Sequence, residues 1–257
     1  MEIKVIVATH KKCKVPEDKM YMPLHVGKEG KEDIGFDGDN TGENISKKNP
    51  NFCELTGLYW LWKNDESDFK GLVHYRRYFK GKGLGKDKWS HVLTRDAAEK
   101  LLRTKEMILT KKQHYFIETI YSHYIHTHHK RDLDETRLII KEIFPEYLST
   151  FDRVMKKRSA HMFNMFITNR EICSKYCDWL FTILFELENR IDISSYSPFE
   201  ARVFGRISEL LLDVWVNKNQ ISYCEVPCIY MGNVNWLKKG IGFLKAKFLK
   251  KGYKESF

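Results

Sequence analysis

The chain has 257 residues, of which 42% are hydrophobic and 14% aromatic, and its formal net charge is +10. A chain of this length and composition can bury the core of one large globular domain, and no apolar run reaches the roughly 18 residues that span a bilayer. The first residues lack the basic segment and small-residue cleavage site of a signal peptide, so we expect a cytoplasmic protein. The six cysteines show neither disulfide-framework nor zinc-ligand spacing, and we expect buried thiols.

In the first half of the chain, patterns typical of strands alternate with patterns typical of helices. Strands are expected at residues 3–8, 22–27, 72–75 and 107–110, and helices at residues 51–64 and 94–103. A polar loop rich in glycine follows the second strand and extends to residue 49. This alternation predicts an α/β fold.

A short apolar strand ends in three cationic or titratable side chains. Residues 71–79 read Gly-Leu-Val-His-Tyr-Arg-Arg-Tyr-Phe, which places His74, Arg76 and Arg77 directly after the strand. Ligands of open α/β sheets bind at the carboxyl ends of strands, and the planar guanidinium group offers paired donors to phosphate. We therefore expect an anionic ligand here. The alternative is a surface strand end with solvated arginines.

The second half of the chain is mainly helical. Helices are expected at residues 134–144, 145–157, 171–190 and 198–217, followed by a strand at residues 221–229. Because no internal repeat or low-complexity linker interrupts the chain, residues 1–236 are interpreted as one domain with a mostly helical C-terminal half.

Residues 237–257 are interpreted as a separate basic tail. Its lysines outnumber its single acidic residue, Glu255, and apolar residues follow a helical spacing between Leu237 and Phe248. A basic amphipathic helix is typical of binding to an anionic membrane surface. The alternative is a terminal helix that packs on the domain and exposes its lysines to water.

Four motifs, in this order, resemble a family of bacterial glycosyltransferases. They read Asp-Asn-Thr-Gly-Glu-Asn-Ile-Ser at 39–46, Asn-Phe-Cys-Glu-Leu-Thr-Gly-Leu-Tyr-Trp at 51–60, the run at 71–79 quoted above, and Ser-Ala-His-Met-Phe-Asn-Met-Phe at 159–166. Members of that family occur among capsule, exopolysaccharide and O-antigen biosynthesis proteins, and the family was long catalogued only as a domain of unknown function. The similarity extends from Ile3 to Trp236.

The resemblance implies a GT-A-like α/β fold and a hexosyltransferase that uses a UDP-sugar donor. The sugar that it implies is galactose, in pyranose or furanose form, and the acceptor is an oligosaccharide linked to a polyprenyl diphosphate. Such an acceptor implies a peripheral protein at the inner face of the cell membrane. The alternative function is nucleic-acid binding without enzymatic activity, because the chain is basic and rich in aromatic residues; no RNA- or DNA-binding signature supports it, and we expect no nucleic-acid partner.

The same resemblance implies a donor site at the end of the 72–75 strand. GT-A enzymes typically carry Asp-x-Asp at this place to hold a divalent cation, whereas this chain carries His74, Tyr75 and Arg76. We therefore predict no metal cofactor, with Arg76 and Arg77 neutralising the departing UDP. The alternative is Mn²⁺ or Mg²⁺ held by other carboxylates.

Further donor contacts are expected from two loops. Asp39 and Asn40 lie in a glycine-containing loop suited to binding uracil or ribose hydroxyls, and an ordinary Asx-turn is the alternative for this loop. Thr9 and His10 follow the first strand, where they are placed to meet the same nucleotide.

Glu200 is the leading candidate for the base that takes the proton of the acceptor hydroxyl. Ser197, Pro198 and Glu200 also match a capping box, which is the structural alternative. His161 is the second catalytic candidate, and Asn164 is expected to orient an acceptor sugar. The alternative for His161 is a core histidine whose ring is hydrogen-bonded by the backbone.

Other acceptor contacts are expected from His128 and Arg202. His128 belongs to a histidine-rich segment with His123, His126 and His129. Because this segment lacks the spacing of zinc ligands, contact with a sugar is favoured over a metal site.

Overall fold

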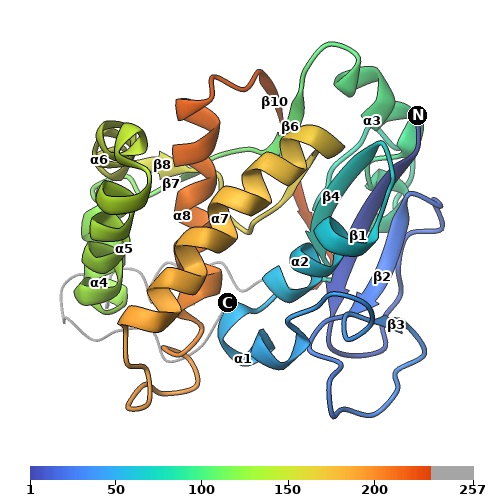
Figure 1. The fold of residues 1–257 in the computed structure, drawn as a ribbon. Coiled ribbons are helices and arrows are strands. Elements are labelled where there is room, and N and C mark those ends of the chain that lie inside the picture. Colours follow the sequence, from blue (N-terminus) through green and yellow to red (C-terminus); the bar gives the residue numbers. More distant parts are fainter. Residues whose placement is uncertain (233–257) are drawn as a thin grey trace.

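The computed structural model describes residues 1–232, so the tail predicted at residues 237–257 lies outside the described residues. A sheet runs through the described part in the order β10-β6-β9-β4-β1-β2-β3, with β5 paired to β4 and β11 paired to β5 (Figure 1). The strands are β1 (Ile3–Thr9), β2 (Tyr21–His25), β3 (Asp37–Gly38), β4 (Phe69–His74), β5 (Arg77–Phe79), β6 (Met107–Thr110), β9 (Phe166–Asn169), β10 (Tyr223–Val226) and β11 (Cys228–Tyr230). The predicted α/β class is confirmed.

The centre of the sheet is parallel, with one antiparallel insertion. β1 pairs in parallel with both β2 and β4, so the carboxyl ends of these strands reach the same edge. β9 lies between β4 and β6 and is antiparallel to both. The sequence pattern does not reveal β9, because this short strand continues directly into helix α7 (Arg170–Arg190).

Two strand predictions need correction. The strand expected at residues 221–229 is two strands, β10 and β11, separated at Pro227, which has no N–H group to donate to a ladder. β4 begins at Phe69, before the expected start at residue 72, and contains Lys70, whose side chain is buried. A lysine next to an apolar run normally indicates that the strand has not yet begun. The Lys70 ammonium donates to the carbonyls of Leu61 (3.2 Å) and Asp65 (2.6 Å) at the end of helix α2 (Leu55–Asn64). The negative end of the helix dipole thus stabilises this buried charge within the strand.

β1 sends its side chains alternately into two apolar layers. Ile6 and Ala8 pack with residues of α2 and α7 on one face. Val5 and Val7 pack on the other face with residues of helix α3 (Arg95–Leu102). Because both faces are covered, β1 and β4 are rich in apolar residues and alternate only weakly with polar ones.

The second half of the chain builds a helical lobe beside the sheet (Figure 1). It contains α4 (Ile120–Thr127), α5 (Lys130–Ile143), α6 (Leu148–Met155) and α8 (Val203–Lys218), with a small sheet of β7 (Gln113–His114) and β8 (Ser159–Ala160). Three expectations are corrected here. The histidine-rich segment, for which no helix was predicted, contains α4. Helix α6 is preceded by the 3-10 turn Pro145–Tyr147, and α8 begins later than residue 198.

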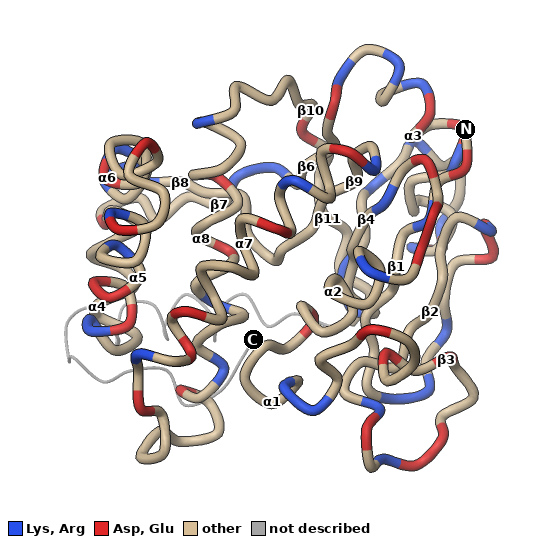
Figure 2. The backbone as a smooth tube through the Cα atoms, in the orientation of Figure 1, with Lys and Arg blue, Asp and Glu red and all other residues tan. Residues whose placement is uncertain are grey.

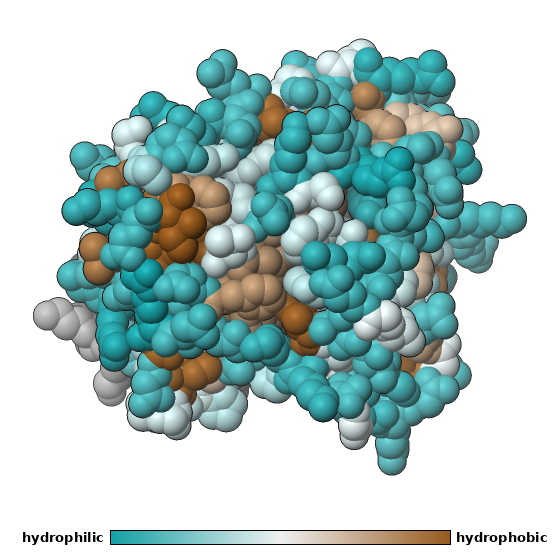
Figure 3. Space-filling model, in the orientation of Figure 1, coloured by the Kyte–Doolittle hydropathy of each residue, from teal (hydrophilic) through white to brown (hydrophobic). Residues whose placement is uncertain are grey.

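The surface is predominantly polar. Figure 2 shows Lys and Arg interspersed with Asp and Glu along α5, where pairs such as Lys130 and Asp134 (2.6 Å) lie on the outside. The face shown in Figure 3 is mostly hydrophilic, with separated apolar patches. In the described part of the chain, no helix combines the length and the apolar character needed to cross a membrane.

The helix expected at residues 51–64 is broken at Cys53. Helix α1 (Asn49–Phe52) ends there because Cys53 adopts a φ of 56°, and α2 starts at Leu55. The Asn49 side-chain amide donates to the Cys53 carbonyl at 2.7 Å, which stabilises the break. The turn also brings Cys53 against Gly205 of α8, where an added Cβ would lie 3.1 Å from the Cys53 sulfur. As a result, Glu54 faces α8 instead of continuing a regular helix.

Candidate functional site

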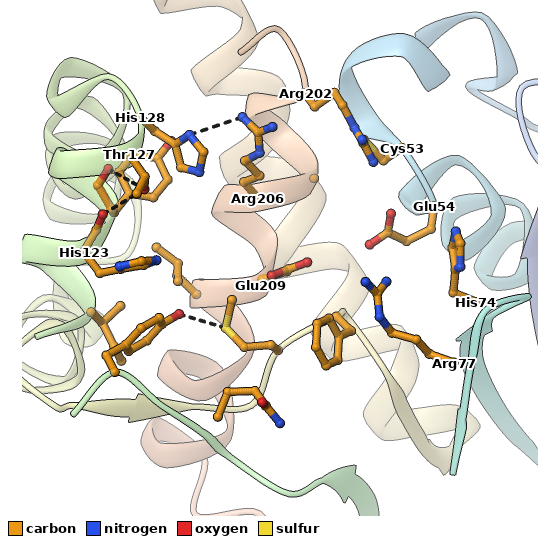
Figure 4. Close-up of a pocket in the computed structure, with 18 of the residues that line it drawn as sticks. Cys53, Glu54, His74, Arg77, His123, Thr127, His128, Arg202, Arg206 and Glu209 are labelled. Carbon is orange, nitrogen blue, oxygen red and sulfur yellow. Dashed lines mark hydrogen bonds between the residues drawn. The ribbon is translucent and has the colours of Figure 1, made fainter. Parts of the chain in front are cut away.

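A cavity of about 360 Å³ lies between the carboxyl end of β4 and the helical lobe (Figure 4). Its charged wall comes from β4, β5, the α1–α2 break and the start of α8, and consists of Glu54, His74, Arg76, Arg77, Arg202, Arg206 and Glu209. Its opposite wall comes largely from α4 and the segment before it, and includes Tyr115, Ile120, His123, Tyr124, Thr127 and His128. The volume is within the range of small-molecule sites.

The arginine cluster of this pocket consists of Arg76, Arg77, Arg202 and Arg206. A tight turn joins β4 to β5, so that His74 pairs with Arg77 across the turn. Burial, followed by the charges of Arg77 and Arg76, lowers the pKa of His74 to about 3. The charges of Arg77 and Arg76 beside this histidine make the local potential positive, which is the environment that an anionic ligand requires.

Arg202, directly before α8, and Arg206, within it, are held by specific contacts. Arg202 Nε donates to the Cys53 sulfur at 3.2 Å. Arg206 lies 3.9 Å from the centre of the Phe199 ring and donates through Nη1 to His128 Nδ1 at 3.3 Å. Burial and Arg206 hold the pKa of His128 far below its usual value, so that this imidazole is a neutral acceptor. Arg206 Nη2 is buried and has no hydrogen-bond partner among the described residues.

Two carboxylates, Glu54 and Glu209, face the arginine cluster. Figure 4 shows both of them and Arg77 converging on the middle of the pocket. Burial and the neighbouring charge of Glu54 raise the pKa of Glu209 to about 7, although Arg77 acts in the opposite direction. Glu209 is therefore a carboxylate that can gain or lose a proton near neutral pH.

Asn164 is buried and does not line the pocket. Its side-chain amide donates to Glu54 Oε1 at 2.8 Å and to the Gly205 carbonyl at 3.1 Å, and its oxygen accepts from Ser208 at 2.9 Å. These bonds use the amide within the protein, so Asn164 orients Glu54 and does not reach an acceptor sugar directly.

Glu200 lies outside the residues that line the cavity. Its carboxylate accepts from the Ser197 hydroxyl at 2.7 Å and from the Ser197 backbone N–H at 3.0 Å, and these bonds lower its pKa. It also pairs with His129 at 3.2 Å. The geometry thus favours the capping-box interpretation over that of a base, even though the regular helix begins only at Val203.

His161 is a core residue. Its side chain is fully buried, with Nδ1 2.5 Å from Asp213 and Nε2 3.1 Å from Glu225. It does not line the cavity. The ring joins α8 to β10 through two carboxylates. The alternative interpretation of a core histidine assumed that the backbone bonds the ring, whereas side chains do so.

Neither Asp39 nor Asn40 lines the cavity. Asp39 is buried and accepts from the N–H groups of Gly27 (2.8 Å) and Lys28 (3.1 Å), so its carboxylate stabilises a loop and is not exposed to a ligand. Asn40 lies next to it, with its amide 3.5 Å from Glu29. This arrangement favours the structural alternative for Asp39, in which its carboxylate holds the loop.

Thr9 and His10 end β1 beside the arginine cluster. The buried Thr9 hydroxyl donates to the Lys11 carbonyl at 2.7 Å. His10 packs edge-on against Tyr75, and burial together with Arg76 lowers its pKa. Of this pair, His10 is the side chain whose pKa is affected by an arginine of the cluster, Arg76, in addition to burial.

A family model described as "Domain of unknown function (DUF4422)" matches residues 4–220. The chain belongs to the DUF4422 family. A comparison with curated proteins finds no match.

This DUF4422 chain is also similar to a solved structure of the bifunctional glycosyltransferase WbbM in its apo form. The two share 29% sequence identity with a TM-score of 0.84, and the match covers 91% of this chain. It covers 46% of the WbbM chain, so the DUF4422 protein spans about half the length of that relative. The likeness confirms the GT-A-like α/β fold that the sequence motifs implied.

The carboxyl end of β4 does not fit a divalent cation in this DUF4422 protein. The place of an Asp-x-Asp motif is taken by His74, Tyr75 and Arg76, and the pKa of His74 is lowered by burial and by two arginines. Among residues 1–232, no group of three or more His, Cys, Asp or Glu side chains is arranged to hold a metal ion.

Sequence reasoning gave no leading role to several residues of the site. Arg206 and Glu209 lie in α8, about one and two turns after Arg202, and both interrupt its mostly apolar first half, which is the signal that could have identified them. No catalytic or binding role was predicted for Glu54 from the sequence. Its role depends on the backbone break at Cys53, which no local pattern predicts.

Proposed function

We propose that this protein transfers a sugar residue from a nucleoside diphosphate sugar to a glycan acceptor. The observation that carries this proposal is the pocket itself, in which an arginine cluster faces a carboxylate with a pKa of about 7. The likeness to WbbM, a glycosyltransferase, supports the same reaction class. The sugar-nucleotide donor and the acceptor would then meet between the β4 edge and the helical lobe.

The arginine cluster would bind the diphosphate of the donor. Arg76 and Arg77 follow β4, while Arg202 and Arg206 approach from α8, so the phosphate oxygens would be held from two sides. As the bond between the anomeric carbon and the phosphate oxygen breaks, negative charge develops on the departing nucleotide. Fixed guanidinium groups in a partly buried site stabilise that charge.

Glu209 would act as the base. The acceptor hydroxyl oxygen attacks the anomeric carbon, and its proton passes to the Glu209 carboxylate as the diphosphate leaves. A pKa of about 7 suits this role, because about half of the carboxylate is ionised at pH 7 and the ionised form accepts a proton readily. Glu54 assists by raising the pKa of Glu209 and is itself held in place by Asn164.

The finer assignment rests on the sequence motifs. The donor is a UDP-hexose, with galactose in pyranose or furanose form as the first choice, and the acceptor is a lipid-linked oligosaccharide of a bacterial surface polysaccharide. The same motifs support a cytoplasmic protein peripheral to the cell membrane. The basic tail proposed to bind the anionic membrane surface lies outside the described residues.

A panel of sugar nucleotides tests the proposal. UDP-galactose, UDP-glucose and their GDP counterparts are added separately, and the melting temperature is measured with and without EDTA, since a ligand bound only by the native state raises stability. We expect stabilisation by UDP-sugars in both conditions, followed by UDP release when a glycan acceptor is added. RNA binding with steep salt dependence, together with indifference to every sugar nucleotide, would replace the proposal with the nucleic-acid alternative.

A further inference from the structure

Glu118 holds two histidines at the edge of the pocket. Its side chain is 4% exposed, and its two carboxylate oxygens contact His123 Nδ1 at 2.9 Å and His126 Nδ1 at 2.6 Å. The two histidines differ in position. His123 lines the pocket, whereas His126 does not and is 38% exposed.

The backbone before α4 fixes this carboxylate. Phe116 adopts a φ of 55°, and the Ile117 N–H donates to the Tyr115 carbonyl at 2.6 Å, which closes a tight turn. Such a turn is strained for a bulky residue, and strained backbone is concentrated at functional sites. Thr119 then caps α4 through a capping box with Ser122, so the helix that carries His123 starts at a defined place.

The contacts set the state of the His123 ring. Burial acts to raise the pKa of Glu118, but the hydrogen bonds from His123 and His126 hold it below its usual value, so Glu118 is a carboxylate. A carboxylate accepts hydrogen bonds, which places a proton on His123 Nδ1 and leaves Nε2 as the acceptor of a neutral ring. Burial lowers the pKa of His123, which also favours the neutral form. Figure 4 shows this ring directed from α4 into the pocket.

The side chains that form the pocket wall beside His123 carry no charge themselves, although Arg206 contacts this wall at His128. The Tyr115 ring stacks on His123 with ring centres 4.4 Å apart, and its hydroxyl contacts the Met162 sulfur at 3.2 Å. Thr127 and the neutral His128 continue this wall along α4. Flat apolar surfaces beside a few fixed hydrogen-bonding groups suit a sugar ring, and these side chains themselves supply no cation to balance a carboxylate on the ligand.

We propose that the α4 wall of the pocket is the subsite for an uncharged sugar residue of the acceptor, with one sugar hydroxyl donating to His123 Nε2 and Glu118 acting as the positioning residue. This inference rests on the proposed glycosyl transfer and adds the substrate class of its acceptor side. It also separates the pocket into a charged donor wall and an uncharged acceptor wall.

Binding of small glycosides tests the inference. Calorimetry measures the Kd of p-nitrophenyl β-galactoside, β-glucoside and β-glucuronide for the full chain saturated with UDP. The variants are His123→Ala, His123→Gln, Glu118→Gln and, as the matched control, His126→Ala, which removes the other histidine bound to the same carboxylate. Circular dichroism verifies folding, and the Gln variants preserve the test should His123→Ala not fold.

We expect at least one neutral glycoside to bind, and His123→Ala to weaken it about tenfold, as for one lost hydrogen bond. His123→Gln should recover part of this loss, because its amide oxygen accepts a hydrogen bond, and His126→Ala should stay within about twofold of the wild type. UDP affinity should be unchanged in all four variants. Glu118→Gln should lose affinity for the neutral glycoside only.

The outcomes separate the inference from the proposed function. Equal glycoside affinity in His123→Ala and wild type, tighter binding of the glucuronide, or binding of UDP without any neutral glycoside would each overturn the inference alone. Absence of binding by UDP and by every UDP-sugar would overturn the proposed glycosyl transfer, and the inference with it.

Discussion

Glu54 Oε1 accepts a hydrogen bond of 2.8 Å from the side-chain amide of Asn164, across a separation of 110 residues. Asn164 adopts a φ of 53°, a left-handed conformation that asparagine tolerates better than most residues. The bond connects the loop before β9 to the break between α1 and α2, and it orients one of the two carboxylates of the pocket.

Asn164→Ala should lower the free energy of unfolding by about 2–4 kcal/mol, because it strains the left-handed backbone and leaves buried polar partners without a hydrogen bond. Urea denaturation measures this effect. Asn164→Gly, which relieves only the backbone strain, should recover part of the loss. Wild-type stability in Asn164→Ala would show that the bond is dispensable.

Arg76→Ala and Arg77→Ala should each weaken UDP binding and reduce the transfer rate by ~10²-fold, as expected for removal of a fixed charge from a developing anion. Calorimetry with UDP and a UDP-release assay measure the two effects. Arg95→Ala, which removes an exposed arginine paired with Glu99, is the matched control. Unchanged UDP affinity in both pocket variants would exclude the arginine cluster as the diphosphate site.

Glu209→Gln should retain UDP binding and lose nearly all transfer. In the wild type, kcat should rise as the pH increases through about 7, because the base must be deprotonated and the pKa of Glu209 is raised to about that value. Glu200→Gln should keep most of the rate, since Gln also serves in a capping box. Loss of transfer in Glu200→Gln with normal folding would return the base assignment to Glu200.

Stability should fall as the pH decreases below about 6.5, partly because of His74. The folded protein lowers the pKa of His74 to about 3, whereas the unfolded chain titrates near 6.5, so the unfolded state gains the proton first. The contribution of neutral, buried His74 to the free energy of unfolding is complete above pH ~6.5 and is lost progressively toward pH 3. His74→Asn should therefore show a shallower loss in urea midpoint between pH 7 and pH 4 than the wild type, and an equal slope would contradict this account.

His161→Ala should destabilise the protein by about 3–5 kcal/mol, since it leaves the buried Asp213 carboxylate without its main partner. UDP affinity, measured where the variant is still folded, should stay near the wild-type value because His161 does not line the pocket. Normal stability combined with lost transfer would instead support the catalytic role considered from the sequence.

Local sequence patterns predicted much of the fold. The strands near residues 3–8, 22–27 and 107–110 and the helix at 171–190 were identified correctly, because side-chain alternation and helical periodicity are properties of neighbouring residues. His74, Arg76 and Arg77 were placed at a strand end for the same reason. The motifs resembling glycosyltransferases added the GT-A-like expectation, which the structure and its likeness to WbbM bear out.

The sequence by itself determined the α/β class, the buried strands and the cationic end of β4. The tertiary structure alone decided that Glu54 and Glu209 share a pocket, that Glu118 binds His123, and that Asp39 and His161 are buried. The physical reason is that hydrogen bonding and a shifted pKa depend on which groups meet in space. These contacts are set by how α8 and α4 pack against the sheet, and the periodicity of neighbouring residues does not predict them.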